Sequence, residues 1–420
     1  MSAVPATNFM NWSDRQKALA VGLIVFANFL QSISVGINAV VFPIALDKYG
    51  FSTSMIGVIM AVEYLSVFGI SIYLPSIMRW LNVGTGLELS TLFRLPALLA
   101  LGYTVSGEGW ALWVLLHGVG NFLFGVLLQT WINSIPFDRA RGFSMGLFGT
   151  SISLGLAMGP VVLSFAGTFE SALLPLIDSI DGLAAQWFGW LVPSEVDDYT
   201  RIGLILSALI STISVLPIVI GRFLVPKFTI TRKGSLARVV RQAPAAMFAV
   251  MLCGFSILGL QTFITVYGLR NGLELRDASF LMTAFMLGSI SLEMPIAALS
   301  DWFDRRYVMI GLVLLSLIAA VYLPIAIYYK WSGWILLFLW GGMIGGLFSI
   351  CLALTADRFH GEDLVAANGA FSLMDNLGGV FGILIIGLGM DLFLEDGLPY
   401  AIMLAAVAYF SFALTRYQVR

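Results

Sequence analysis

Five ionisable side chains lie inside long apolar stretches of this sequence, where such groups are rare. In chain order they are Glu63, Arg94, His117, Glu293 and Asp375. An ionised group at membrane depth costs at least about 2.5–3.5 kcal/mol, so each is by default a functional hypothesis. Desolvation favours the neutral form of a carboxyl group, and a carboxyl exposed alternately to two compartments could load and release a proton. Glu63 and Asp375 are the candidate proton carriers.

Two readings of Glu63 remain open at this level. Glu63 and Arg94 fall near the middle of consecutive apolar stretches. As antiparallel helices these stretches would place the two residues at similar depth, so they could instead form a static ion pair. His117 could take part in proton coupling, although a histidine in an apolar helix is more often a satisfied core residue.

Twelve apolar stretches, each long enough to cross a bilayer, position these residues. The chain of 420 residues is 59% hydrophobic and 11% charged, whereas a soluble domain carries about 25% charged residues. A hydrocarbon core about 30 Å thick needs roughly 20 apolar residues in a helix. The sequence therefore predicts an all-α polytopic membrane protein, with spans at 18–41, 53–76, 83–104, 109–133, 143–167, 202–221, 243–267, 278–300, 306–328, 332–354, 364–390 and 397–415.

The basic residues give the expected orientation. Cytoplasmic loops are enriched in Lys and Arg, and the richer set of loops here lies on the side of both termini. A basic segment at 222–242 is therefore a cytoplasmic linker between six-helix halves at 1–221 and 243–420. The acidic connection at 168–200 is expected outside the cytoplasm, with an interfacial helix. The net charge of −2 indicates no nucleic-acid partner.

The two halves share landmarks that suggest an internal repeat. Gly155 and Gly159, followed by Pro160, have the same GxxxG spacing as Gly378 and Gly382, 223 positions later. Small residues at this spacing let helices pack closely in lipid. Repeated halves are the usual scaffold of secondary transporters.

The loop after the eighth span resembles the signature G-x-x-x-D-R-x-G-R-R of the major facilitator superfamily. It reads Ala297-Ala-Leu-Ser-Asp301-Trp-Phe-Asp304-Arg305-Arg306, in which Asp301, Arg305 and Arg306 match while Ala297, Trp302 and Asp304 depart. The run from Gly155 to Pro160 is similar to a fifth-helix signature of exporters in that family. Residues 359–368 resemble a stretch common in its small, poorly characterised bacterial members.

The resemblance covers essentially the whole chain and implies two pseudo-symmetric six-helix bundles. It implies a secondary transporter of the bacterial inner membrane that works by alternating access, with a proton gradient as energy source and no cofactor. We expect a monomer whose partners are a small-molecule solute and the lipid bilayer. It also implies a cytoplasmic gate at Asp301, Arg305 and Arg306, which Glu293 joins from two turns away. Because the first-half copy of the signature lacks the aspartate, we expect this gate to be asymmetric.

By analogy with the family, the first, fourth, seventh and tenth spans would surround a substrate cavity, and the eleventh span would also line it. Uncharged donors and acceptors suit a neutral or weakly charged organic solute. The alternative is that such amides and hydroxyls hold helices together. The candidates are Gln31, Ser34 and Asn38, which share one helix face, with Asn121, Trp131, Gln261, Thr265, Asn376 and the neighbouring Asp375.

Two other functions remain as alternatives. Met247, Met251, Met282 and Met286 form two pairs at i, i+4, and soft thioethers favour copper(I), which would make the chain a copper importer. Methionine is also an ordinary apolar filler. A non-transporting receptor or assembly protein would use the acidic connection for docking. No metal-ligand spacing of histidines, phosphate loop or nucleophile elbow supports an enzyme.

Overall fold

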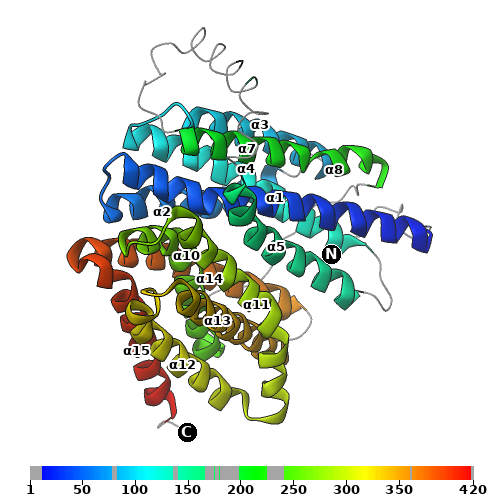
Figure 1. Ribbon diagram of the computed structural model, residues 1–420. Coiled ribbons are helices and arrows are strands. Elements are labelled where there is room, and N and C mark those ends of the chain that lie inside the picture. The colour runs from blue at the N-terminus through cyan, green and yellow to red at the C-terminus, as the bar shows by residue number, and fades with distance from the viewer. Residues whose placement is uncertain are drawn as a thin grey trace. The chain divides into compact units, whose positions relative to one another are not determined.

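A computed structural model describes residues 12–77, 83–135, 141–165, 175, 179, 198–224, 241–359 and 362–417. All regular secondary structure in these ranges is helical (Figure 1). Each of the twelve predicted spans coincides with one helix, apart from the sixth, which is divided into α7 and α8. The membrane helices are α1 (Asp14–Lys48), α2 (Thr53–Ile77), α3 (Val83–Leu101), α4 (Gly107–Ser134), α5 (Arg141–Ser164), α7 (Asp198–Ile213), α8 (Leu216–Ile220), α10 (Pro244–Arg270), α11 (Leu275–Trp302), α12 (Arg305–Ala326), α13 (Lys330–Arg358), α14 (Glu362–Leu392) and α15 (Gly397–Tyr417).

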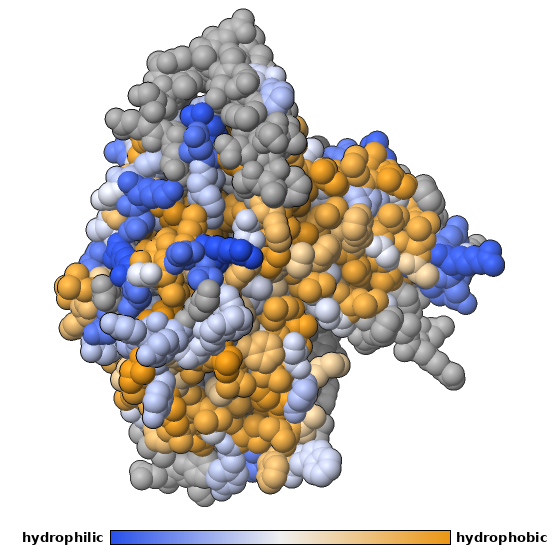
Figure 2. Space-filling model, viewed as in Figure 1, coloured by the Kyte–Doolittle hydropathy of each residue, from blue (hydrophilic) through white to orange (hydrophobic). Residues whose placement is uncertain are grey.

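The helices expose apolar surface that lipid must cover. Within the described residues, nine helices are long and apolar enough to cross a membrane, and two shorter apolar helices cover Thr53–Ser66 and Gly397–Phe412. Wide apolar areas are visible in Figure 2. On α12, Leu314, Ile318, Val321 and Ile325 are all exposed and recur on one helix face. The predicted twelve-helix membrane fold is confirmed.

The chain divides into two compact units. Unit 1 contains Met1–Ala45 and Val62–Arg232, and unit 2 contains Leu46–Ala61 and Lys233–Arg420. The end of α1 and the start of α2 thus group with the helices of the second half. Most of the expected linker at 222–242, and nearly all of the expected interfacial segment at 168–200, lie outside the described residues.

Glycines let α1 and α5 of unit 1 meet backbone to backbone. A Cβ added to Gly155 would lie 2.6 Å from the carbonyl oxygen of Phe29, and one added to Gly36 would lie 2.6 Å from that of Leu156. Gly159, which precedes Pro160 within α5, lies directly against Gly36. These distances leave no room for any side chain at the crossing.

Unit 2 repeats this arrangement with α10 and α14. Gly378 and Gly382 of α14 lie against the backbone of Met251 and Phe255. On α10, Gly254 lies against the backbone of Asp375. The GxxxG sequences of both halves therefore sit at close helix crossings.

The α1–α2 segment of unit 2 is held by two polar contacts that sequence reasoning missed. Arg270, at the end of α10, is 2.5 Å from the Asp47 carboxylate. Asp391 of α14 accepts hydrogen bonds from the backbone N–H groups of Thr53 and Ser54, at 2.8 and 2.9 Å. These N–H groups begin α2, where helical donors lack partners and the helix dipole favours an anion.

Candidate functional site

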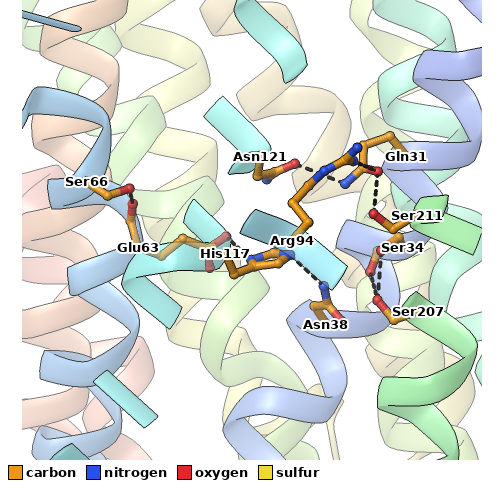
Figure 3. Close-up of polar contacts among 10 residues, drawn as sticks. All are labelled: Gln31, Ser34, Asn38, Glu63, Ser66, Arg94, His117, Asn121, Ser207 and Ser211. Carbon is orange, nitrogen blue, oxygen red and sulfur yellow. Dashed lines mark hydrogen bonds and ion pairs between the residues drawn. The ribbon is translucent and has the colours of Figure 1, made fainter. Parts of the chain in front are cut away.

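The Glu63 carboxylate contacts the His117 imidazole inside unit 1, and the contact is an ion pair when the ring is protonated. Oε1 of Glu63 is 3.1 Å from Nδ1 of His117, and the side chains are 14% and 1% exposed. The other ring nitrogen, Nε2, is 3.3 Å from Nδ2 of Asn38 on α1 (Figure 3). Glu63, His117 and Asn38 thus form a polar chain from α2 through α4 to α1.

Local packing fixes the imidazole in place. Gly118, next to His117, has no side chain, and a Cβ there would lie 2.6 Å from Ser66 Oγ and 2.7 Å from the Glu63 carbonyl oxygen. Phe42 of α1 meets the imidazole edge-on, with ring centroids 5.7 Å apart. The glycine lets α2 approach α4 closely enough for a side chain as short as glutamate to reach the ring.

Arg94 belongs to a separate polar cluster. Its Nη1 donates to Oε1 of Gln31, and its Nη2 lies 3.4 Å from Ser90 Oγ and 3.3 Å from Thr91 Oγ1. The guanidinium carbon is 4.3 Å from the ring centroid of Phe124, a cation–π distance. Arg94 is fully buried, and none of its partners in the described chain is a carboxylate. The static Glu63–Arg94 ion pair considered from sequence is therefore not formed.

The geometry of α4 explains why these two charges do not meet. Glu63 approaches α4 at Gly118, whereas Arg94 approaches it at Gly120, where a Cβ would lie 2.6 Å from Arg94 Cγ. Two residues along an α-helix correspond to a rotation of about 200°. The two side chains thus reach α4 on nearly opposite faces.

The polar residues expected to line a cavity in the first half form hydrogen bonds between helices of unit 1, and their cavity role stays a prediction. Nε2 of Gln31 donates to Asn121 Oδ1 at 3.2 Å, and Ser34 bonds to Ser207 of α7 at 2.7 Å. Ser211 and Ser214 also bond to Gln31 Oε1, at 3.0 and 3.2 Å. Sequence reasoning missed these three serines, since an isolated serine in an apolar helix carries no signal of its own. Trp131 is fully buried in the apolar core around α4.

In unit 2 the predicted polar residues are more scattered. Nε2 of Gln261 contacts Met286 Sδ at 3.7 Å, and Thr265 is buried. Oδ1 of Asp375 is buried without a hydrogen-bond partner, while Asn376 donates to the Ser372 carbonyl oxygen at 2.8 Å. A cavity role for these residues stays a prediction.

The expected gate residues lie at the α11–α12 connection. Ser349 of α13 donates to the Glu293 carboxylate. Asp304, a departure from the family signature, caps α12 by accepting from the backbone N–H of Arg306 at 2.9 Å. Arg305 is half-buried and Arg306 exposed, whereas the side chain of Asp301 lies outside those described. The gate stays a prediction.

The methionines considered for copper are mostly packed among apolar neighbours. Met247, Met282 and Met286 are buried. In the described parts of the chain, no three His, Cys, Asp or Glu residues gather as metal ligands would. The contact of Met286 with Gln261 gives that thioether a neutral partner.

Comparison with known proteins points in one direction. A model of the Major Facilitator Superfamily matches residues 246–418. The uncharacterized MFS-type transporter YfkF of Bacillus subtilis (strain 168) is 24% identical over 390 residues, which cover 91% of each chain. The uncharacterized MFS-type transporter YcaD of Shigella flexneri is 20% identical over 391 residues, covering 93% of each.

Two solved structures share the fold. A bacterial homolog of the human lysosomal transporter Spinster, in an inward-facing and unoccupied conformation, has a TM-score of 0.72 at 14% identity and covers 96% of both chains. The nucleoside transporter NupG has a TM-score of 0.69 at 14% identity, covering 94% of this chain and 98% of its own. The family model that matches the second half of the chain, the relatives along nine-tenths of its length and the twelve-helix fold all agree: the chain is similar to transporters of the major facilitator superfamily.

Proposed function

We propose that the protein is a proton-coupled secondary transporter of a small organic solute, and that Glu63 and His117 together bind the transported proton. The observation that carries this proposal is the 3.1 Å contact between the two side chains at membrane depth. The protein would work by alternating access in the bacterial inner membrane, as a monomer with both termini in the cytoplasm and without a cofactor.

The charge balance of the pair explains how it would couple. With one added proton, Glu63 and His117 carry no net charge, either as two neutral groups or as carboxylate and imidazolium. Loss of that proton leaves a net charge of −1 between helices. Isolated charge is costly in the membrane interior but tolerated next to water. The pair would therefore keep its proton while occluded and release it where the site opens to solvent.

The uncharged polar surroundings support the choice of cargo. Gln31, Asn121 and the serines of α7 are neutral, and Arg94 is the one buried cation in the described part of unit 1. Recognition of a strongly anionic solute generally uses several arginines. A neutral or weakly charged organic solute fits this composition best.

Transport in proteoliposomes tests the proposal. Solutes that raise the thermal stability of the purified protein would be found first, in a panel of nucleosides, sugars, amino acids, carboxylates and drugs. Solute-driven proton movement is then followed with an internal pH dye. Glu63→Gln should abolish proton movement while solute exchange continues. Glu88→Gln is the matched control, because Glu88 faces the exposed Arg222 at 3.7 Å. Proton movement by Glu63→Gln at the wild-type ratio to solute would refute the proposal.

A further inference from the structure

We infer that Asn38 is a third member of the proton-binding site, and that its amide rotates by half a turn when the Glu63–His117 pair gains a proton. This inference rests on the proposed function and extends it. Asn38 would act as a positioning residue, and it would link proton binding to α1.

The hydrogen-bond inventory of the site carries the argument. A neutral imidazole has one N–H donor and one acceptor nitrogen, whereas an imidazolium has two donors. Nδ1 of His117 faces the Glu63 carboxylate, which only accepts when ionised, so Nδ1 carries the proton. Nε2 is then the acceptor, and Nδ2 of Asn38 donates to it at 3.3 Å.

The other end of the Asn38 amide has no partner. Asn38 is 3% exposed, and its Oδ1 is a buried oxygen without a hydrogen bond. A buried, unpaired carbonyl oxygen is uncommon and needs an explanation. Here the explanation is that Oδ1 is the acceptor for a second state of the ring.

Addition of one proton from water completes that second state. An O–H bond of a hydronium ion breaks and an N–H bond forms at Nε2, so the hydronium becomes water and the net charge of the three residues changes from −1 to 0. The new Nε2–H would oppose the amide N–H groups of Asn38. Rotation of the amide about its last side-chain bond then brings Oδ1 to the ring, where it accepts from Nε2. Each protonation state thus matches one orientation of the amide.

In the described structure, Glu63 is the one charged group that hydrogen-bonds to the His117 ring. From α2 the ring meets Glu63, and from α1 it meets Asn38 and the edge of Phe42. Arg94 of α3 reaches α4 on a different face and bonds to Gln31. Since Gln31 and Ser34 precede Asn38 on the same face of α1, a change at Asn38 acts on the helix that also bonds to α3, α4 and α7.

Nitrogen NMR tests this without knowledge of the solute. The chain has two histidines, so His360→Gln leaves His117 as the single ¹⁵N-histidine signal in lipid nanodiscs. At high pH, His117 should be the Nδ1–H tautomer, and acidification should protonate Nε2. Asn38→Leu removes both hydrogen-bonding ends of the amide. The ¹⁵N chemical shift of Nε2 should therefore lose its hydrogen-bond contribution in the neutral and in the protonated ring alike. Asn38→Asp supplies acceptors and no donor, so it should keep the hydrogen bond of the protonated ring and lose that of the neutral ring.

This difference between the two protonation states is the signature, because a residue that merely packs against the ring would not distinguish them. Wild-type Nε2 signals of both states in Asn38→Leu would overturn the inference. So would a wild-type signal of the neutral ring in Asn38→Asp. If Asn38→Leu does not fold, the nearly isosteric Asn38→Asp decides alone. Loss of this inference would leave Glu63 and His117 as a two-residue site, whereas coupled transport by Glu63→Gln would refute the proposed function whatever the NMR result.

Discussion

Replacing Gly118 by alanine, which adds a single methyl group, should break the contact between Glu63 and His117. A Cβ at residue 118 would lie 2.6 Å from Ser66 Oγ, 2.7 Å from the Glu63 carbonyl oxygen and 2.9 Å from Glu63 Cγ. The carbonyl belongs to the α2 backbone and cannot rotate away. In Gly118→Ala, α2 must therefore retreat from α4.

The size of this shift follows from the distances. To restore an ordinary contact of 3.4 Å from 2.7 Å, α2 must move by about 0.7 Å. A shift along the Glu63–His117 direction would lengthen their 3.1 Å contact to about 3.8 Å, beyond hydrogen-bond range. Overpacking of this kind costs about 1–3 kcal/mol. Alanine favours the helix over glycine by about 1 kcal/mol, which partly hides that cost.

A second glycine of α4, Gly125, provides the control for the gain in helix propensity. Gly125 has no atom within 4 Å of its would-be Cβ, so Gly125→Ala changes helix propensity alone. Reversible unfolding in detergent should place Gly118→Ala about 1–3 kcal/mol below Gly125→Ala in stability. The ¹⁵N spectrum should show the Glu63–His117 hydrogen bond weakened only at position 118. Equal stability and identical His117 spectra in the two variants would refute the proposed packing of the site.

Three further substitutions test other parts of the structure. Asp391→Ala removes the acceptor for the first N–H groups of α2 and should lower the free energy of unfolding by about 0.5–2 kcal/mol. Asp396→Ala is the control, and equal free energies of unfolding for the two variants in detergent would exclude a capping role for Asp391. Asp375→Asn should raise the melting temperature, because Oδ1 is buried without a partner and an amide is less costly to bury than a carboxylate, and it should leave solute-driven proton movement intact. Lost proton movement would make Asp375 a carrier instead. Asp301→Asn should change the rate of solute exchange in proteoliposomes, and an unchanged rate would remove Asp301 from the gate.

The fold could be predicted closely because its signal is long and local. About 20 consecutive apolar residues specify a span regardless of its neighbours, and the predicted spans differ from the helices mainly in end positions. The sixth span is the exception. There the chain turns between α7 and α8, just before Pro217 at the start of α8, and a proline both starts helices well and interrupts them.

The site could be predicted only in part. Glu63, Arg94 and His117 could be found because ionisable residues stand out in an apolar sequence. The sequence also indicates how deep each lies along its helix, but not which neighbouring helix its side chain faces. The rotation depends on where Gly118 and Gly120 admit α2 and α3. The Asp391 cap was beyond reach for another reason, since 338 positions separate it from Thr53.

The glycines show that the two halves share one packing plan. In unit 1, Gly36 lies against Gly159. The residues 223 positions later are Gly259 and Gly382 of unit 2, and a Cβ added to Gly259 would lie 3.6 Å from the backbone of Gly382. Likewise Gly118 meets Ser66, and 223 positions later a Cβ at residue 341 would lie 3.1 Å from the backbone nitrogen of Ser289. Four contacts at one constant offset, from different helix pairs, indicate duplication of a six-helix unit.

The chemistry of the two halves differs at the same offset. The counterparts of Asn38, Glu63 and His117 are Gln261, Met286 and Trp340, which still touch through the Gln261–Met286 contact but include no ionisable group. The glycines at the close crossings occur in both halves, because two helices cannot approach closely without them. The protonatable pair occurs in only one half. Since an unpaired charge is costly in each bundle, a second copy of the pair would bring a second proton per cycle. In the proposed function, proton binding at this pair changes the charge of unit 1, and the counterpart of the pair in unit 2 binds no proton.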